Sequence, residues 1–178
     1  MSTDRAARDF TLSWTLDAPP AEVFQAWTDP EHLDWFYNDE QPIPAEPIEV
    51  DLRIGGAWRQ QMIVDENTAY VTGGVYREIV PGERLVFSWG AAGGWPELDP
   101  EQLDDSPLVT VTMDEADGRT ELTVHVVLPA TLSRESMPEH WFDHISAGWR
   151  DTVDRLAASL AAETSSVASA PRAPLAED

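Results

Sequence analysis

The amino-acid sequence predicts an α+β fold in which a curved antiparallel β-sheet wraps around a long C-terminal helix. Short segments that alternate apolar and polar residues, as half-buried strands do, follow one another through most of the chain. Turn signals made of glycine, proline, asparagine and aspartate separate these segments. An amphipathic helical pattern follows the last strand segment. We therefore expect the apolar face of the sheet and that of the helix to pack against each other.

The chain begins with a predicted strand and two predicted short helices. Phe10–Leu16 alternates apolar and polar residues, and Pro19-Pro20 ends this strand where a helix can begin. The apolar residues of Ala21–Trp27 then share one helical face. Asp29-Pro30-Glu31 is a second start signal, a capping aspartate before a proline, so Glu31–Trp35 is predicted as another short helix.

Six further strands form a predicted meander after a proline-rich loop. The strands are expected at Ile48–Leu52, Trp58–Val64, Ala69–Val80, Arg84–Trp89, Leu108–Met113 and Thr120–Leu128. Gly55-Gly56 is predicted to form a tight hairpin turn, because glycine takes a positive φ without steric cost. Asp117-Gly118 is a strong signal for the last hairpin. The acidic segment from Gly90 to Ser106 is the longest irregular stretch.

The closing helix is marked by a capping box and by an apolar stripe. Ser136 and Glu139 have the spacing of a capping box. The stripe that follows recurs every three or four residues and comprises Trp141, Ile145, Gly148, Thr152, Leu156 and Leu160. The helix is expected to end near Glu163. Residues 1–163 are therefore predicted to form one domain, and residues 164–178, which lose this periodicity, a disordered tail.

Composition limits the function classes. The chain has 178 residues, 42% of them hydrophobic, and a formal net charge of −22, with arginine as its only basic side chain. Such a charge repels nucleic acids and anionic membrane surfaces, so neither is an expected partner. There is no cysteine, and hence no disulfide or thiolate chemistry. No long apolar segment or signal region is evident, and a cytoplasmic protein is the simplest interpretation.

The predicted order of one strand, two short helices, six strands and a long helix is that of the helix-grip fold. The chain resembles the START-like, birch-pollen-allergen-like superfamily, also called SRPBCC. Within it, the chain is similar to the small bacterial form of the heat-shock-protein-90 ATPase activator homologue group. The resemblance covers roughly residues 8–163 and rests on Ala18-Pro19-Pro20-Ala21-Glu22-Val23-Phe24, Trp27-Thr28-Asp29-Pro30, Trp35-Phe36, Asp51-Leu52-Arg53-Ile54-Gly55-Gly56, the segment from Gly74 to Trp89, and Gly148-Trp149.

The resemblance implies a cavity between the sheet and the last helix. Members of the superfamily bind lipids, hormones or polyketides, assist chaperones, or in a few cases act as cyclases or hydroxylase components. No catalytic signature is common to them, so no catalytic residue or cofactor is predicted here. The residues expected to line the cavity are Trp35, Phe36, Trp58, Arg59, Met62, Tyr76, Phe87, Trp89, Trp141, His144, Ile145 and Trp149. The alternative is that these aromatic side chains simply fill the core.

Polar candidates are few. His140 and His144 have the spacing of a helical metal pair, but a complete zinc site needs a third ligand and no HExxH pattern is present, so no metal is predicted. Arg59 and Glu78 are interpreted as a cross-strand pair, with Arg59 as an anchor for a ligand carboxylate in the alternative. Glu78 and Asp143 are the candidates for general acid–base chemistry.

Three functions follow as hypotheses. The first is a binding protein for a small hydrophobic or amphipathic molecule held between the sheet and the helix. The second is a protein-interaction module like the chaperone activator domain, and the third is a cyclase- or hydrolase-type enzyme that uses the same cavity. A small hydrophobic molecule is the expected partner, a protein partner is the alternative, and the chain is expected to be a monomer or a homodimer.

Overall fold

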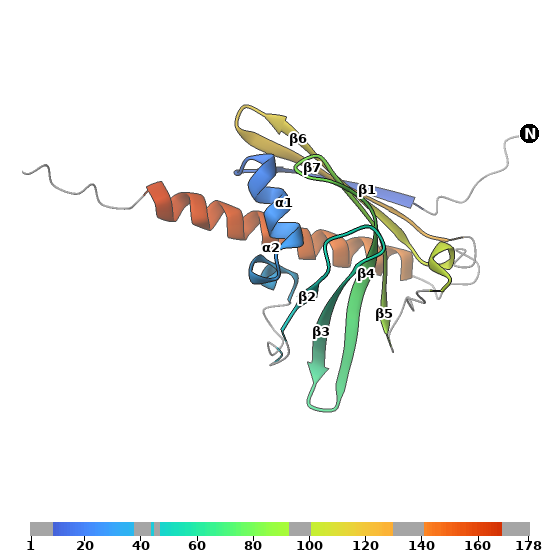
Figure 1. The fold of residues 1–178 in the computed structure, drawn as a ribbon. Helices are drawn as coiled ribbons and strands as arrows, with labels where there is room; N and C mark the ends of the chain where they lie inside the picture. The colour runs from blue at the N-terminus through green and yellow to red at the C-terminus, as the bar shows by residue number, and fades with distance from the viewer. Residues whose placement is uncertain (1–8, 38–43, 45–46, 93–100, 130–140, 169–178) are drawn as a thin grey trace, which may run out of the picture.

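A computed structural model describes residues 9–37, 44, 47–92, 101–129 and 141–168. It confirms the predicted α+β architecture. One antiparallel sheet of seven strands has the order β1-β7-β6-β5-β4-β3-β2, and the long helix α2 lies along the inner side of the curved sheet (Figure 1). The strands are β1 (Asp9–Leu16), β2 (Glu49–Val50), β3 (Ala57–Asp65), β4 (Thr68–Val80), β5 (Arg84–Ala92), β6 (Leu108–Ala116) and β7 (Arg119–Val127). The helices are α1 (Pro20–Thr28) and α2 (Trp141–Ala168), with 3-10 turns η1 (Pro30–His32), η2 (Asp34–Phe36) and η3 (Leu103–Asp105).

The structure differs from the sequence prediction most clearly at the second predicted helix, at β2 and at the end of α2, and β5 and β6 each end three residues later than predicted. The predicted second helix is instead two 3-10 turns, because Asp29 caps the first through the Glu31 amide at 2.9 Å and Leu33 leaves helical geometry after three residues. Strand β2 is only two residues long, since the chain turns at Asp51, whose carbonyl accepts from the Arg53 amide at 2.9 Å. Helix α2 ends at Ala168, beyond the predicted end. The predicted capping box lies outside the described residues.

The β6–β7 hairpin closes as predicted and sets the sheet register. Asp117 and Gly118 both have positive φ, at 54° and 78°, which is the geometry of the turn that matches strand twist. Ala116 then pairs with Arg119, and each strand of the hairpin presents alternate residues to the core. Leu122, Val124 and Val126 are fully buried on the inner face of β7.

The two glycines of the predicted turn between β2 and β3 serve different purposes. Gly55 has a φ of +83°. Gly56 does not, but a Cβ atom there would lie 2.1 Å from the Asp51 carbonyl oxygen, so only glycine fits. The turn is also fastened to β4, because the Gly55 amide donates to the Tyr76 carbonyl at 2.8 Å and the Tyr76 amide donates to the Gly56 carbonyl at 2.9 Å.

A row of aromatic side chains joins η2, the sheet and α2. Phe36 of η2 lies 5.2 Å from Trp58 of β3, and Trp58 lies 5.9 Å from Phe87 of β5, ring centroid to ring centroid. Trp149 of α2 closes the row at 6.1 Å from Phe36 and 6.4 Å from Phe87. Most of these contacts are edge-to-face, the arrangement that the ring quadrupoles favour.

The turn geometry predicts unequal costs for two neighbouring glycines. Gly56→Ala is expected to lower the free energy of unfolding by about 2–4 kcal/mol, because the added Cβ meets a backbone carbonyl that cannot move aside. Gly55→Ala is expected to cost about 1–2 kcal/mol, from backbone strain alone. Gly148→Ala, in α2 with open space at its Cβ position, is expected to stabilise by about 0.5–1 kcal/mol. Urea unfolding measures all three, and a larger cost at Gly55 than at Gly56 would contradict this account.

Candidate functional site

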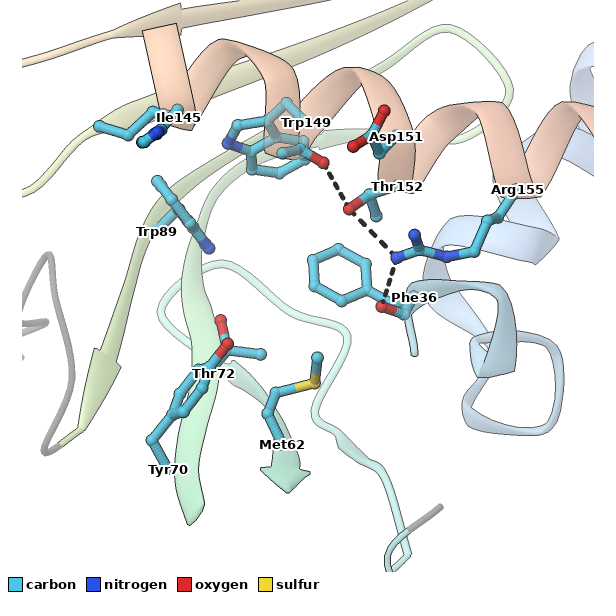
Figure 2. A pocket seen from close by; sticks show the side chains of 12 residues that line it. Phe36, Met62, Tyr70, Thr72, Trp89, Ile145, Trp149, Asp151, Thr152 and Arg155 are labelled. Carbon is cyan, nitrogen blue, oxygen red and sulfur yellow. Dashed lines mark hydrogen bonds between the residues drawn. The ribbon is translucent and has the colours of Figure 1, made fainter. Parts of the chain in front are cut away.

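A cleft of about 320 Å³ lies between helix α2, turn η2 and strands β3 to β5 (Figure 2). The sheet and η2 contribute mainly aromatic and methionine side chains to its wall, and α2 contributes both apolar and polar ones. The lining residues are Phe36, Met62, Tyr70, Thr72, Trp89, His144, Ile145, Gly148, Trp149, Asp151, Thr152 and Arg155.

Strand pairing and helical periodicity explain how this wall is assembled. Met62 of β3 pairs with Tyr70 of β4, so a hairpin brings both side chains to the same face of the sheet. Ile145, Gly148 and Thr152 are spaced by three and four residues and therefore share one face of α2. Gly148 leaves a gap in that face, because nothing lies within 4 Å of the position that its Cβ would occupy.

Arg155 fixes the position of η2 against α2. Its Nε donates to the Trp35 carbonyl at 3.0 Å, and its Nη2 donates to the Phe36 carbonyl at 3.1 Å and to the Thr152 hydroxyl oxygen at 3.3 Å. The carbonyls at the end of a short helical turn have no partners within the turn, so the guanidinium satisfies them. Arg155 thereby holds Phe36 in the wall of the cleft, as the dashed lines in Figure 2 show.

The polar groups of the cleft differ in the hydrogen bonds that they can still form with a bound molecule. The Thr72 hydroxyl donates to the Gly90 carbonyl at 3.2 Å, and the Thr152 hydroxyl donates to the Gly148 carbonyl at 2.7 Å. The indole N–H groups of Trp89 and Trp149 are buried and have no hydrogen-bond partner. Burial also raises the pKa of Tyr70 above its ordinary value, because the charged phenolate is poorly solvated there.

Half of the residues predicted from the sequence line this cleft. They are Phe36, Met62, Trp89, His144, Ile145 and Trp149. Met62, Ile145 and Trp149 are buried, whereas His144 is exposed at the rim. The structure therefore brings together side chains from η2, the sheet and α2, as the predicted cavity between sheet and helix requires.

Four others belong to the packed interior. Trp35 donates its indole N–H to the Ala26 carbonyl at 2.9 Å, and its ring packs on Trp27 of α1. Trp58 and Phe87 contribute to the lining of a void of only about 10 Å³, room for at most one water molecule. Tyr76 is 1% exposed, and its backbone forms the hydrogen bonds that hold the Gly55-Gly56 turn against β4. For these four residues, the structure agrees with the alternative prediction, in which the aromatic side chains fill the core.

Arg59 is not brought to the cleft. It is exposed, whereas Trp58, Gln60 and Met62 of the same strand are buried, because successive strand residues face opposite sides of the sheet. Arg59 pairs in register with Gly73 and Glu49, and Glu78 instead forms an ion pair with Arg84 at 3.3 Å. The predicted Arg59–Glu78 pair is therefore wrong. Trp141 starts helix α2, but its side chain lies outside the described residues.

Sequence reasoning missed Tyr70, Thr72, Gly148, Asp151, Thr152 and Arg155 as cleft residues. Gly148 and Thr152 belong to the helical stripe, so their spacing was a usable signal. The β3–β4 register would have identified Tyr70 through its partner Met62. Arg155 carries no such signal, since an arginine on an amphipathic helix is ordinarily a solvent-facing residue.

The candidates for acid–base and metal chemistry do not converge in the described part of the chain. Glu78 is paired with Arg84, and Asp143 is exposed. His140 lies outside the described residues, and no group of three or more His, Asp or Glu side chains within those residues is arranged to hold a metal ion.

The acidic segment after β5 lies away from the cleft where it is described. Asp104 of η3 is 3.7 Å from Arg77, and Arg77 also donates to the Ser88 hydroxyl at 3.2 Å. Residues Glu101 to Asp105 surround Arg77 and contribute nothing to the cleft wall.

A curved sheet that encloses a long helix, with a cleft between them, defines a protein of the helix-grip class. Residues 17–161 match the model of the family described as Activator of Hsp90 ATPase homolog 1-like protein, and the chain belongs to this family. This confirms the resemblance that the sequence motifs carry. No curated protein matches the chain in sequence.

Solved structures with the same fold come from several bacteria. Protein CV1439 from Chromobacterium violaceum is 24% identical over 86% of this chain and 96% of its own, with a TM-score of 0.65. Protein Ms6760 from Mycobacterium smegmatis is 20% identical over 90% of this chain and 95% of its own, with a TM-score of 0.69. CalU16 from Micromonospora echinospora is 20% identical over 90% of this chain and 81% of its own, with a TM-score of 0.58. At these identities the likeness shows the fold.

Across the described residues, no helix is both long and apolar enough to cross a lipid bilayer.

The burial of Tyr76 predicts a loss of stability at alkaline pH. Burial, and to a lesser extent the Asp51 carboxylate, raises the pKa of Tyr76 above its ordinary value. Above pH ~10 the unfolded chain releases this proton while the folded chain keeps it, so the free energy of unfolding falls as pH rises. Tyr76→Phe is expected to make this fall shallower in urea titrations between pH 8 and pH 11.

The same substitution is expected to change stability at pH 7 by less than about 1 kcal/mol, because the Tyr76 hydroxyl has no hydrogen-bond partner to lose. An equally steep alkaline fall in the variant would show that Tyr76 does not cause the fall. A loss of more than about 2 kcal/mol at pH 7 would show that the hydroxyl is hydrogen-bonded.

Proposed function

We propose that this protein binds a small hydrophobic or amphipathic molecule in the cleft between the sheet and helix α2. The observation that carries the proposal is the cleft itself, with an apolar wall of Phe36, Met62 and Trp89 facing a polar rim. Its volume of about 320 Å³ is near the lower end of the range common for small-molecule sites. Membership of the family supports it, since the cleft lies where the resemblance places a cavity.

Two observations weigh against the alternatives. A protein-interaction surface of the chaperone-activator type would be supported by exposed tryptophans on the outer face of the sheet. The tryptophans whose side chains are described are Trp14, Trp27, Trp35, Trp58, Trp89 and Trp149, and all of them are buried or half-buried. The Trp14 indole donates to Asp154 of α2 at 2.8 Å. An enzyme would be supported by a desolvated carboxylate or histidine in the cleft, but Asp151 and His144 are both exposed.

Filling the cleft from the helix side is expected to block binding. Gly148→Leu directs a side chain into the gap of the cleft wall at a position with open space, so folding is retained. The neutral dye N-phenyl-1-naphthylamine is expected to bind the wild-type protein saturably, with quenching of tryptophan fluorescence. Its affinity is expected to fall at least about tenfold in the variant, since overfilling a site costs on the order of 1–3 kcal/mol.

Ala147→Leu is the matched control, because Ala147 is an exposed neighbour on the same helix that does not line the cleft. It adds a leucine side chain to α2 without entering the cleft and is expected to bind the dye like the wild-type protein. Equal affinities for both variants, or no saturable binding by the wild-type protein, would refute the proposed function.

A further inference from the structure

We propose that the molecule bound in the cleft is an anion, an amphipathic carboxylic acid whose carboxylate lies against Arg155 and whose apolar body lies against Phe36, Met62 and Trp89. This inference rests on the proposed function and adds the chemical class of the ligand. It is carried by the charge of Arg155 in the cleft lining and by the apolar side chains that lie beside it.

The polar groups of the cleft wall include acceptors as well as donors. Thr72 and Thr152 donate their hydroxyl protons to backbone carbonyls, so their oxygens can only accept from a bound molecule. The Trp89 and Trp149 indoles, which are donors only, are buried without partners, and Figure 2 shows the Trp89 nitrogen pointing into the cleft. A buried N–H without an acceptor is costly, so a ligand that brings an oxygen to one of these indoles binds more tightly than one that does not.

Arg155 adds a positive charge to the wall of the cleft. Its three hydrogen bonds all go to neutral oxygens, and no carboxylate forms an ion pair with it among the residues that the structure describes. Its remaining nitrogen, Nη1, donates to none of them. Arg155 is half-buried, so solvent screens its charge only in part. A guanidinium suits a carboxylate better than a neutral oxygen, because charge-assisted hydrogen bonds are about twice as strong.

The carboxylates and histidine nearest the cleft do not fill this role. Asp151 lies one helical turn before Arg155 and lines the cleft, but it is exposed and no ion pair joins the two. His144 is exposed at the same rim. Asp154, the neighbour of Arg155, faces β1, where it accepts from Trp14 at 2.8 Å.

The cleft also limits the size of the ligand. A volume of about 320 Å³ equals the liquid volume of on the order of ten water molecules. An acid with an alkyl chain of about ten atoms therefore matches it, with the carboxylate at the Arg155 end and the chain directed past Phe36 toward Trp89 (Figure 2).

The test compares three probes of equal chain length that differ in charge: decanoate, decanol and decylamine. Each displaces N-phenyl-1-naphthylamine from the wild-type protein at pH 7.5. Decanoate is expected to bind about tenfold more tightly than decanol, and decylamine most weakly. Arg155→Met is expected to reduce the ratio of decanoate to decanol affinity to about one. Arg150→Met, which removes an exposed arginine of the same helix outside the cleft wall, is expected to leave the ratio unchanged.

Loss of the Arg155 hydrogen bonds to η2 can change the shape of the cleft. Such a change affects decanoate and decanol alike, so it cancels in the ratio of their affinities within one variant. If Arg155→Met does not fold, the ratio of decanoate to decanol affinity in the wild-type protein decides by itself. If the wild-type protein binds the dye but binds decanol as tightly as decanoate or more tightly, the inference is overturned and the proposed function stands. Failure of the dye and all three probes overturns both.

Discussion

The cleft depends on where helix α2 is held above the sheet. Two adjacent residues hold it against two different elements: Asp154 accepts a hydrogen bond from Trp14 of β1, and Arg155 donates to the carbonyls of η2. After this point, Leu156 and Leu160 are buried in the core, so the C-terminal part of the helix packs closely. Before it, the face that carries Ile145, Gly148 and Thr152 passes over the sheet and leaves space. These two contacts thus hold the helix where Trp149, Val153 and Leu156 pack in the core while Gly148, Thr152 and Arg155 line the cleft.

The aromatic residues are divided in the same way. Trp27, Trp35, Trp58 and Phe87 fill the interior next to η2 and leave only a small void. Trp89 and Trp149, 5.2 Å apart between ring centroids, line the open space farther along the helix. Phe36 belongs to both sets, because it packs on Trp58 and also faces the cleft. A packed core and a ligand cleft are therefore parts of one structure here, whereas the sequence presents them as alternatives.

Most of the fold could be predicted from the sequence, because local signals determine it. Period-two alternation and turns such as Asp117-Gly118 place the strands, and the apolar stripe places the helix. The cleft wall was only half predictable. Chemical type suggested aromatic residues, but the choice between core and cleft depends on register and on the position of α2. Arg59 was assigned to the wrong face although alternation with Trp58 opposes it, and the role of Arg155 depends on a contact with η2, 120 positions earlier in the chain.

The central claim is that the space between α2 and the sheet, rather than an outer surface, receives the ligand. Nuclear magnetic resonance of the tryptophan indole N–H groups tests it most directly, with decanoate as the titrant. The account predicts saturable shifts of the Trp89 and Trp149 signals, whose N–H groups are unpaired in the cleft, and a constant Trp14 signal, whose N–H is bonded to Asp154. Unchanged Trp89 and Trp149 signals, or a Trp14 signal that shifts with the same midpoint, would contradict it.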